Sequence, residues 1–127
     1  MTKDFYGYVE KYANYNGFEL DINDIELHVK NDTCEITKWD IDGLEKPNIF
    51  TLLNTYTDDD IKIYNNFKSL RNKRNILLNK TDYKLMTDYL YKDDNEKQKW
   101  IDYRQALRDL PLNTIDPENP VWPTPPE

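Results

Sequence analysis

The stretch that decides the fold is residues 58–79, which read DDDIKIYNNFKSLRNKRNILLN. Thr57 or Asp58 can accept the first free backbone N–H groups of a helix, and three aspartates in its first turn suit the positive end of the helix dipole. Capping explains these aspartates without a metal ion. One face of the helix would carry Tyr64, Phe67, Leu70, Arg74 and Leu77, with Ile63 and Leu78 beside it. The segment therefore predicts one long helix over residues 58–79.

A second helix is predicted over roughly residues 95–109, after a loop over residues 79–94. Acidic side chains crowd its start, and Pro111 is expected to end it. An apolar stripe at helical spacing consists of Trp100, Tyr103, Leu107 and Leu110. Two helices joined by one loop should pack antiparallel along this stripe.

An antiparallel pair would place the basic end of the first helix opposite the acidic start of the second. The residues expected to form ion pairs there are Arg71, Lys73, Arg74, Asp93, Asp94 and Glu96. Residues 61–80 carry six basic and no acidic side chains, so they could also attract phosphate or an acidic partner. Pairing within the chain is the preferred interpretation.

The N-terminal part predicts short strands. Residues 4–16 fit a helix that begins at Asp4 and stops at Gly17, although a strand over residues 5–9 is the alternative. Apolar side chains alternate within residues 18–39 in three groups, which predicts three short strands: Phe18, Leu20 and Ile22; Ile25, Leu27 and Val29; Cys34 and Ile36. Pro47 and Asn48 predict a short helix over residues 49–53 that packs on this sheet.

The predicted fold class is therefore α+β. A small antiparallel β region with a short helix occupies residues 1–57 and is expected to be a docking region. An antiparallel helical hairpin with a proline-rich tail occupies residues 58–127. The tail begins near Pro111, and its prolines favour an extended conformation.

Composition excludes several classes of function. The chain has 127 residues and a net charge of −7, which argues against a general nucleic-acid binder. No apolar run is long enough for a membrane helix, and residues 1–20 lack the apolar core of a signal peptide. A single Cys34 and a single His28 argue against a disulfide framework and a Cys/His zinc site. We expect no cofactor, no metal ion and no catalytic residues; His28 is predicted on the surface and Cys34 as a small buried side chain.

Aromatic residues make up 13% of a chain that is only 38% hydrophobic. Tyrosine and tryptophan are enriched at protein interfaces because they bury a large area while keeping a polar group. Two interpretations are open: a subunit whose burial is completed by partners, or a small core built from tyrosines.

Three motifs stand in the second half of the chain. They are Arg74-Asn75-x-Leu77-Leu78-x-x-Thr81-Asp82-Tyr83, then Trp100-x-x-Tyr103-Arg104-Gln105-Ala106-Leu107-Arg108-Asp109-Leu110-Pro111, and finally Trp122-Pro123. Together they resemble the phage tail assembly chaperone-like domain over about residues 70–127. The chain departs from that pattern at Tyr83, where the family usually has tryptophan, and at Thr87 and Leu90, where prolines are common.

The resemblance implies a non-enzymatic protein of a tailed bacteriophage, made in the host cytoplasm, that binds other tail or tail fibre proteins. We expect a virion-associated structural or accessory component of the tail. The alternative is a transient tail fibre assembly chaperone that is absent from the mature particle. Self-association within the assembly stays open, and no nucleic acid, membrane or small-molecule substrate is expected.

The motif residues are the expected interaction or structural site. They are Arg74, Asn75, Leu77, Leu78, Thr81, Asp82, Tyr83, Trp100, Tyr103, Arg104, Leu107, Arg108, Asp109, Pro111, Trp122 and Pro123. In one interpretation they pack within the chain: Arg104 or Arg108 binds oxygens of the 79–94 loop or the tail, and Trp122 folds the tail back. In the other they form a face that docks a partner.

Overall fold

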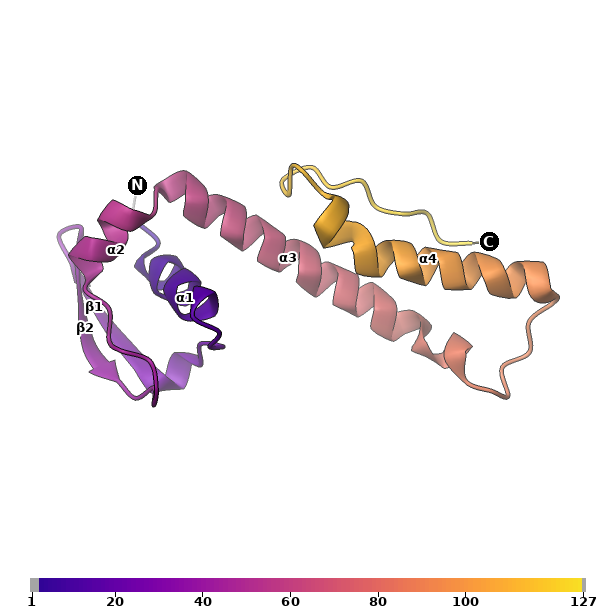
Figure 1. Cartoon of the computed structure of the whole chain (residues 1–127), viewed down its shortest axis with the longest axis horizontal. Helices are drawn as coiled ribbons and strands as arrows, with labels where there is room; N and C mark the ends of the chain where they lie inside the picture. The colour runs from indigo at the N-terminus through magenta and orange to yellow at the C-terminus, as the bar shows by residue number, and fades with distance from the viewer. Residues whose placement is uncertain (1–2, 127) are drawn as a thin grey trace. The chain divides into compact units, whose positions relative to one another are not determined.

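The computed structural model describes residues 3–126 (Figure 1). The chain is α+β, as predicted, with a two-stranded antiparallel sheet near the N-terminus and a helix pair near the C-terminus. Two compact units meet between Asn65 and Asn66. The elements in chain order are α1 (Phe5–Tyr15), the 3₁₀ turn η1 (Ile22–Asp24), β1 (Ile25–Lys30), β2 (Thr33–Trp39), α2 (Ile49–Thr55), α3 (Asp58–Thr81), the 3₁₀ turn η2 (Asp82–Leu85) and α4 (Asp94–Asn113).

Residues 5–15 form a helix, so the helical alternative for this segment is confirmed. The Asp4 side chain caps α1 by accepting a hydrogen bond from the backbone N–H of Gly7 at 2.9 Å. Gly7 is required for packing as well. A Cβ added there would lie only 2.7 Å from a side-chain carbon of Ile61, so the glycine lets α1 approach the start of α3 closely.

The sheet is a hairpin of β1 and β2. Asn31 and Asp32 connect the strands with φ values of 51° and 62°, the left-handed pair that a tight two-residue hairpin turn needs. Ile25 pairs with Trp39 and Val29 with Cys34. Within residues 3–126 the sheet has only these two strands, so the prediction of a strand at Phe18, Leu20 and Ile22 is wrong. The Asp21 side chain accepts the N–H of Asn23 and starts η1 instead.

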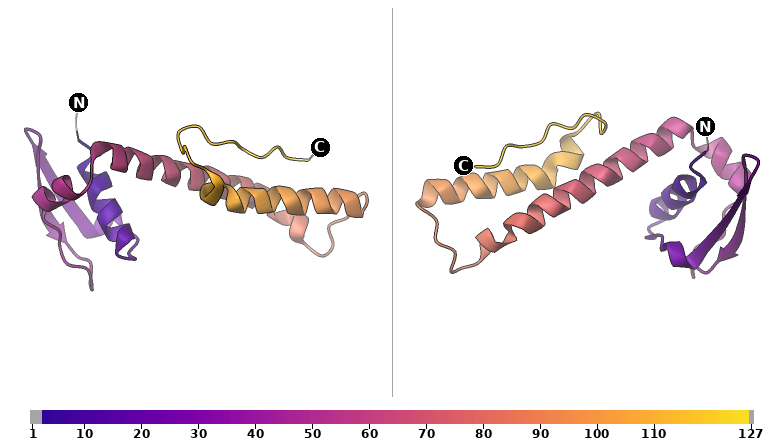
Figure 2. Two further views of the ribbon diagram at one scale, coloured as in Figure 1. Left: turned by 45° about the horizontal axis from the view of Figure 1, so that its top comes forward. Right: turned by 180° about the vertical axis from the view of Figure 1, so that it is seen from behind.

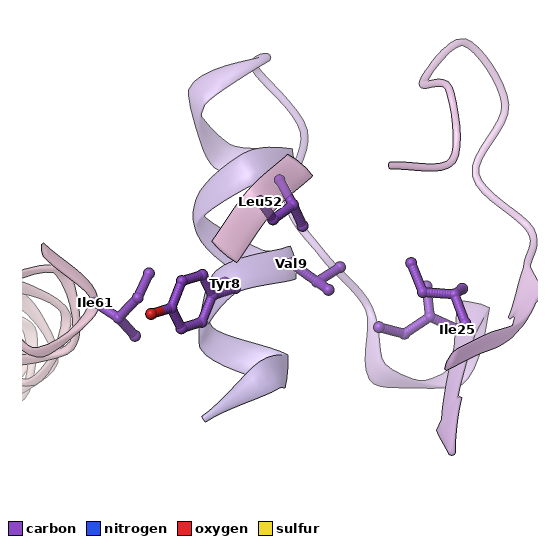
Figure 3. Packing of buried hydrophobic residues seen from close by; sticks show 6 residues of the cluster. Tyr8, Val9, Ile25, Leu52 and Ile61 are labelled. Carbon is purple, nitrogen blue, oxygen red and sulfur yellow. The ribbon is translucent and has the colours of Figure 1, made fainter. Parts of the chain in front are cut away.

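A small apolar core holds the first unit together. It consists of Tyr8, Val9, Ile25, Ile36, Leu52 and Ile61. Figure 3 shows Tyr8 pointing toward Ile61 of α3 and Val9 pointing toward Ile25 of β1. Burial of each such side chain stabilises the fold by roughly 1.5–3 kcal/mol. The core therefore depends on α1, the sheet, α2 and the first turns of α3 together.

α2 begins after Asn48, as predicted. The Asn48 side chain accepts the N–H of Thr51, and Leu52 enters the core beside the half-buried Trp39. The indole N–H of Trp39 donates to the backbone carbonyl of Leu44 at 2.8 Å. This bond ties the connector between the sheet and α2 to the end of β2.

α3 begins with reciprocal capping. The Thr57 hydroxyl accepts the N–H of Asp60 at 3.0 Å, and the Asp60 carboxylate accepts the N–H of Thr57 at 2.9 Å. Asp58 accepts hydrogen bonds from Lys3 and from the phenol of Tyr8. α3 continues to Thr81, two residues beyond its predicted end. Its residues up to Asn65 belong to the first unit and the rest to the second.

α4 contains a proline that was expected to end it. The Asp93 side chain accepts the N–H of Glu96 and caps the helix, but α4 passes through Pro111 and ends at Asn113. The prediction that Pro111 stops the helix is wrong. A proline removes one backbone hydrogen bond, and so near the C-terminal end only the last turn is weakened. Leu110 is buried and the Thr114 hydroxyl donates to its carbonyl at 2.6 Å, which holds that turn in place.

Candidate functional site

Arg104 joins the two helices of the second unit. Its side chain is buried, and Nη1 donates to the backbone carbonyl of Leu78 at 2.8 Å and to the hydroxyl of Thr81 at 2.5 Å. Nη2 donates to the Asp82 carboxylate at 2.7 Å. The planar guanidinium thus binds the last turn of α3 and the start of η2 at once, a geometry that lysine cannot copy. The prediction that an arginine of α4 binds oxygens of the 79–94 loop is confirmed for Arg104.

Arg108 takes no part in this junction. It is exposed and donates to the side chain of Gln105, one turn away on the same helix. Asp109 accepts a hydrogen bond from the Gln105 amide at 3.0 Å. These three residues therefore form a polar surface network on α4.

Lys84 lies inside an aromatic cage. Its Nζ lies 4.1 Å from the ring centre of Trp100, 4.6 Å from that of Tyr89 and 5.2 Å from that of Tyr83. It also donates to the Tyr89 hydroxyl at 2.7 Å, and the Tyr91 hydroxyl donates to the Lys84 carbonyl. Burial lowers the pKa of Lys84, but the hydrogen bond to Tyr89 and the neighbouring phenol of Tyr83 outweigh it, so the pKa is raised. The caged ammonium ties the loop to the start of α4 by cation–π contacts.

The apolar stripe of α4 lies in the core of the second unit. Tyr103, Leu107 and Leu110 are buried, as is Leu70 of α3. Trp100 is half-buried and meets Tyr103 edge to face at 5.7 Å between ring centres. Its indole nitrogen is buried and has no hydrogen-bond partner. Of the motif residues on α3, Leu77 and Leu78 are half-buried.

The predicted ion pairs between the two helices are wrong. Arg71 stacks on Phe67, Lys73 lies over Trp122, and Arg74 donates to the Asn75 side chain. On the other side Asp93 caps α4, and Glu96 accepts the N–H of Lys92. Acidic residues near the start of α4 are used for capping, which leaves the basic side chains of α3 to nearer aromatic and amide groups.

The C-terminal segment turns back along α4. Asp116 accepts hydrogen bonds from the backbone N–H of Glu118 and from the side chain of Asn119, and these close a turn. Both views of Figure 2 show the yellow segment running beside α4. The Lys73 ammonium lies 4.6 Å from the ring centre of Trp122, which confirms the expectation that Trp122 packs against the helix pair.

A groove of about 760 Å³ lies between α4 and this segment. One wall is a face of α4 and the other is residues 114–123, including Trp122 and Pro123. Two large apolar side chains of its lining, Ile115 and Val121, are exposed, as is Leu112 in the last turn of α4. The surface of the loop before α4 exposes Leu85, Met86 and Leu90. The second unit therefore has a core held by the contacts of Arg104 and Lys84, together with apolar side chains that are exposed.

Residues 67–127 match the family described as phage tail assembly chaperone protein. The match covers the second compact unit, and its residues include the Arg104 junction, the Lys84 cage and the groove. It agrees with the resemblance found in the three motifs. Neither the curated proteins nor the solved structures contained a match to the chain.

The phage tail assembly chaperone region contains functional candidates that the motifs did not include. Lys84, Tyr89 and Tyr91 lie in a segment whose sequence indicates only a loop. Three tyrosines around one lysine within nine residues are a signal of a cation–π cluster, although their spacing follows neither a helix nor a strand. The groove face of α4 was missed because its polar side chains resemble an ordinary solvated face.

The single histidine and the single cysteine lie on the two strands of the hairpin. His28 is exposed on β1, and Cys34 is half-buried, less buried than predicted, because β2 is an edge strand of a two-stranded sheet. Burial raises the pKa of the Cys34 thiol. Residues 3–126 hold no cluster of three or more His, Cys, Asp or Glu side chains that could bind a metal ion. Within the same residues, no helix is both long and apolar enough to cross a membrane.

Proposed function

We propose that the chain is a non-enzymatic component of a tailed bacteriophage that binds other tail or tail fibre proteins and stays in the virion tail. The observation that carries this proposal is the family match over residues 67–127. The structure supports a binding role because the match falls on a helix pair held by a buried arginine and flanked by exposed apolar side chains. Exposed apolar side chains that line one groove, as Ile115 and Val121 do, are typical of interaction sites.

Retention in the particle is favoured by the first compact unit. It has its own core, formed by α1, the hairpin, α2 and the first turns of α3. A second folded unit offers an additional surface for contacts with neighbouring proteins in an assembly. We propose that residues 1–57 act as that docking region and residues 58–127 as the chaperone-like region.

A transient tail fibre assembly chaperone is the second candidate. The family description favours it, and the exposed Leu85, Met86 and Leu90 suit reversible capture of apolar segments. Such a protein would be made in the host cytoplasm, bind an unassembled tail protein there and leave before the tail matures.

Quantitative mass spectrometry of purified particles separates the two. Peptides of this chain at a constant ratio to another tail protein, across all particle fractions of a density gradient, are expected for a virion component. Peptides found in the infected cell but absent from the particles would instead identify the transient chaperone. Normal tails in a phage that lacks the gene would refute both.

A further inference from the structure

The groove between α4 and residues 114–123 is bounded on one side by a single face of α4. Its α4 side is formed by Asp102, Gln105, Ala106, Asp109, Leu110 and Asn113. These positions are spaced by three or four residues, so they lie on one face of the helix. This face differs from the apolar stripe of Trp100, Tyr103, Leu107 and Leu110, and the two have only Leu110 in common. α4 therefore presents one face to α3 and another to the groove.

Two carboxylates on the α4 side of the groove, those of Asp102 and Asp109, form no ion pair with a lysine or arginine of residues 3–126. Within the described part of the chain, they accept hydrogen bonds only from the neutral amides of Gln98 and Gln105. Seven residues along a helix span about 10.5 Å, so these two carboxylates lie too far apart to hold one metal ion together. They are spaced instead to receive two separate cationic side chains.

The same groove has an apolar part. Ala106, Leu110, Val121 and Trp122 contribute to its lining, as does Ile115, whose side chain is 97% exposed. Val121 is 85% exposed. Burial of these two side chains under a partner would remove apolar area from water that the chain by itself leaves uncovered.

The wall of the groove is held before any partner arrives. The Thr114 hydroxyl donates to the Leu110 carbonyl, Asp116 closes the turn that follows, and Trp122 is held under Lys73. A preformed wall lowers the entropy that binding would otherwise cost. The contact between Lys73 and Trp122 thus holds one wall of the groove in addition to stabilising the tail.

We propose that this groove binds a segment of another tail protein in which lysine or arginine side chains stand beside apolar ones. The proposal rests on the proposed function, and it names the chemistry of the partner and the surface that receives it. The basic side chains pair with Asp102 and Asp109, and the apolar ones cover Ile115 and Val121. A segment rich in glutamate is rejected, because its charges would meet the same aspartates.

The test uses the purified full-length chain and a short amphipathic peptide of leucine and lysine, capped at both ends, titrated by isothermal calorimetry. We expect saturable binding that weakens as salt is raised, and no binding of a matched leucine–glutamate peptide. The double substitution Asp102→Asn with Asp109→Asn should weaken binding about tenfold, because asparagine keeps the shape and the hydrogen-bond acceptor but removes the charge. Asp42→Asn with Asp59→Asn changes the net charge equally at exposed positions of the first unit and should leave binding unchanged.

The apolar contact is tested separately. Ile115→Ser should weaken the leucine–lysine peptide several-fold, whereas Ile76→Ser, at a half-exposed position of α3 outside the groove, should not. Unfolding curves of all variants verify that each one is folded. Equal weakening by the groove and control aspartate pairs would mean that the peptide senses only net charge, and it would overturn the proposal.

Two further results would also overturn it. In one, the chain without peptide sediments as a dimer, and the double substitution Asp102→Asn with Asp109→Asn makes it a monomer. The groove would then be filled by a second copy of the chain. Equal binding of the leucine–glutamate peptide would show an unselective apolar surface. The proposed function fails on different data, since the presence of the unmodified chain in particles is measured without the peptide.

Discussion

Replacement of Arg104 by lysine should weaken the second unit without removing its charge. An ammonium group can reach one or two of the three oxygens that the guanidinium binds at 2.5–2.8 Å. The Leu78 carbonyl keeps a hydrogen bond from the Thr81 hydroxyl at 3.1 Å, but loss of the charged hydrogen bond from the guanidinium costs about 1.5–3 kcal/mol of stability. The Asp82 side chain is 56% exposed, so water replaces much of its pairing, and its loss adds about 1 kcal/mol or less.

One effect acts in the opposite direction. The Nε of Arg104 is buried without a hydrogen-bond partner, and lysine removes that donor. The net expectation for Arg104→Lys is therefore a loss of about 2–3 kcal/mol, which is a large share of the 5–15 kcal/mol typical of a domain. With a denaturant slope of about 1–3 kcal/mol per molar urea, the unfolding midpoint should fall by about 1 M.

The assay is urea unfolding of the full chain, followed by the amide NMR signals of Leu107 in α4 and Val9 in α1. Leu107 reports on the second unit, and Val9 reports on the core of the first. Arg108→Lys is the matched control, because it makes the same substitution on the same helix at an exposed position. An unchanged Leu107 midpoint in Arg104→Lys, equal to that of the control, would refute the reasoning.

The remaining predictions concern four other places. Trp100→Ala should lower the unfolding free energy by about 2–4 kcal/mol in calorimetry. The loss is smaller than for a fully buried tryptophan because Trp100 is half-buried. An unchanged melting temperature would contradict its place in the apolar stripe of α4. Hydrogen bonds from Tyr8 and Lys3 lower the pKa of Asp58, so the stability that its carboxylate contributes is present above pH 3.8 and is lost as pH falls below it. In Asp58→Asn the unfolding free energy should therefore depend less on pH in that range. Burial and the hydrogen bond to Asp58 raise the pKa of Tyr8 from 10.0 to about 12. The stability that the protonated phenol contributes is therefore complete below pH 10 and disappears as pH rises toward 12. Phenolate absorbance, compared with that of Tyr8→Phe, measures this titration. His28→Ala and Cys34→Ser should leave particle assembly unchanged, and elemental analysis should find no stoichiometric zinc.

Much of the local structure could be predicted because it depends on neighbouring residues. Asp4, Asn48 and Thr57 cap helices at the predicted places, and each cap needs only a side chain and an N–H two or three residues away. The turn at Asn31 and Asp32 is equally local. One failed prediction also has a local cause: the cap made by Asp21 replaces a strand that alternation alone favoured.

The candidate site was predictable only in part. The motif residues Arg104, Thr81 and Asp82 do meet, because their types are complementary and a hairpin brings them together. Arg108 belongs to the same motif but faces solvent, and helical spacing alone does not distinguish its side of α4 from that of Arg104.

By itself, the sequence determined most of the element types, the helix pair and the family of the C-terminal region, since spacing, caps and motifs are properties of the chain in order. Only the tertiary structure decided which side chains meet over long separations. Lys73 holds Trp122, Lys84 enters a cage completed by Trp100, and the C-terminal segment forms a groove with α4. These contacts depend on how the helices cross and where the chain turns back, and that is set by the packing of the whole unit rather than by any short stretch.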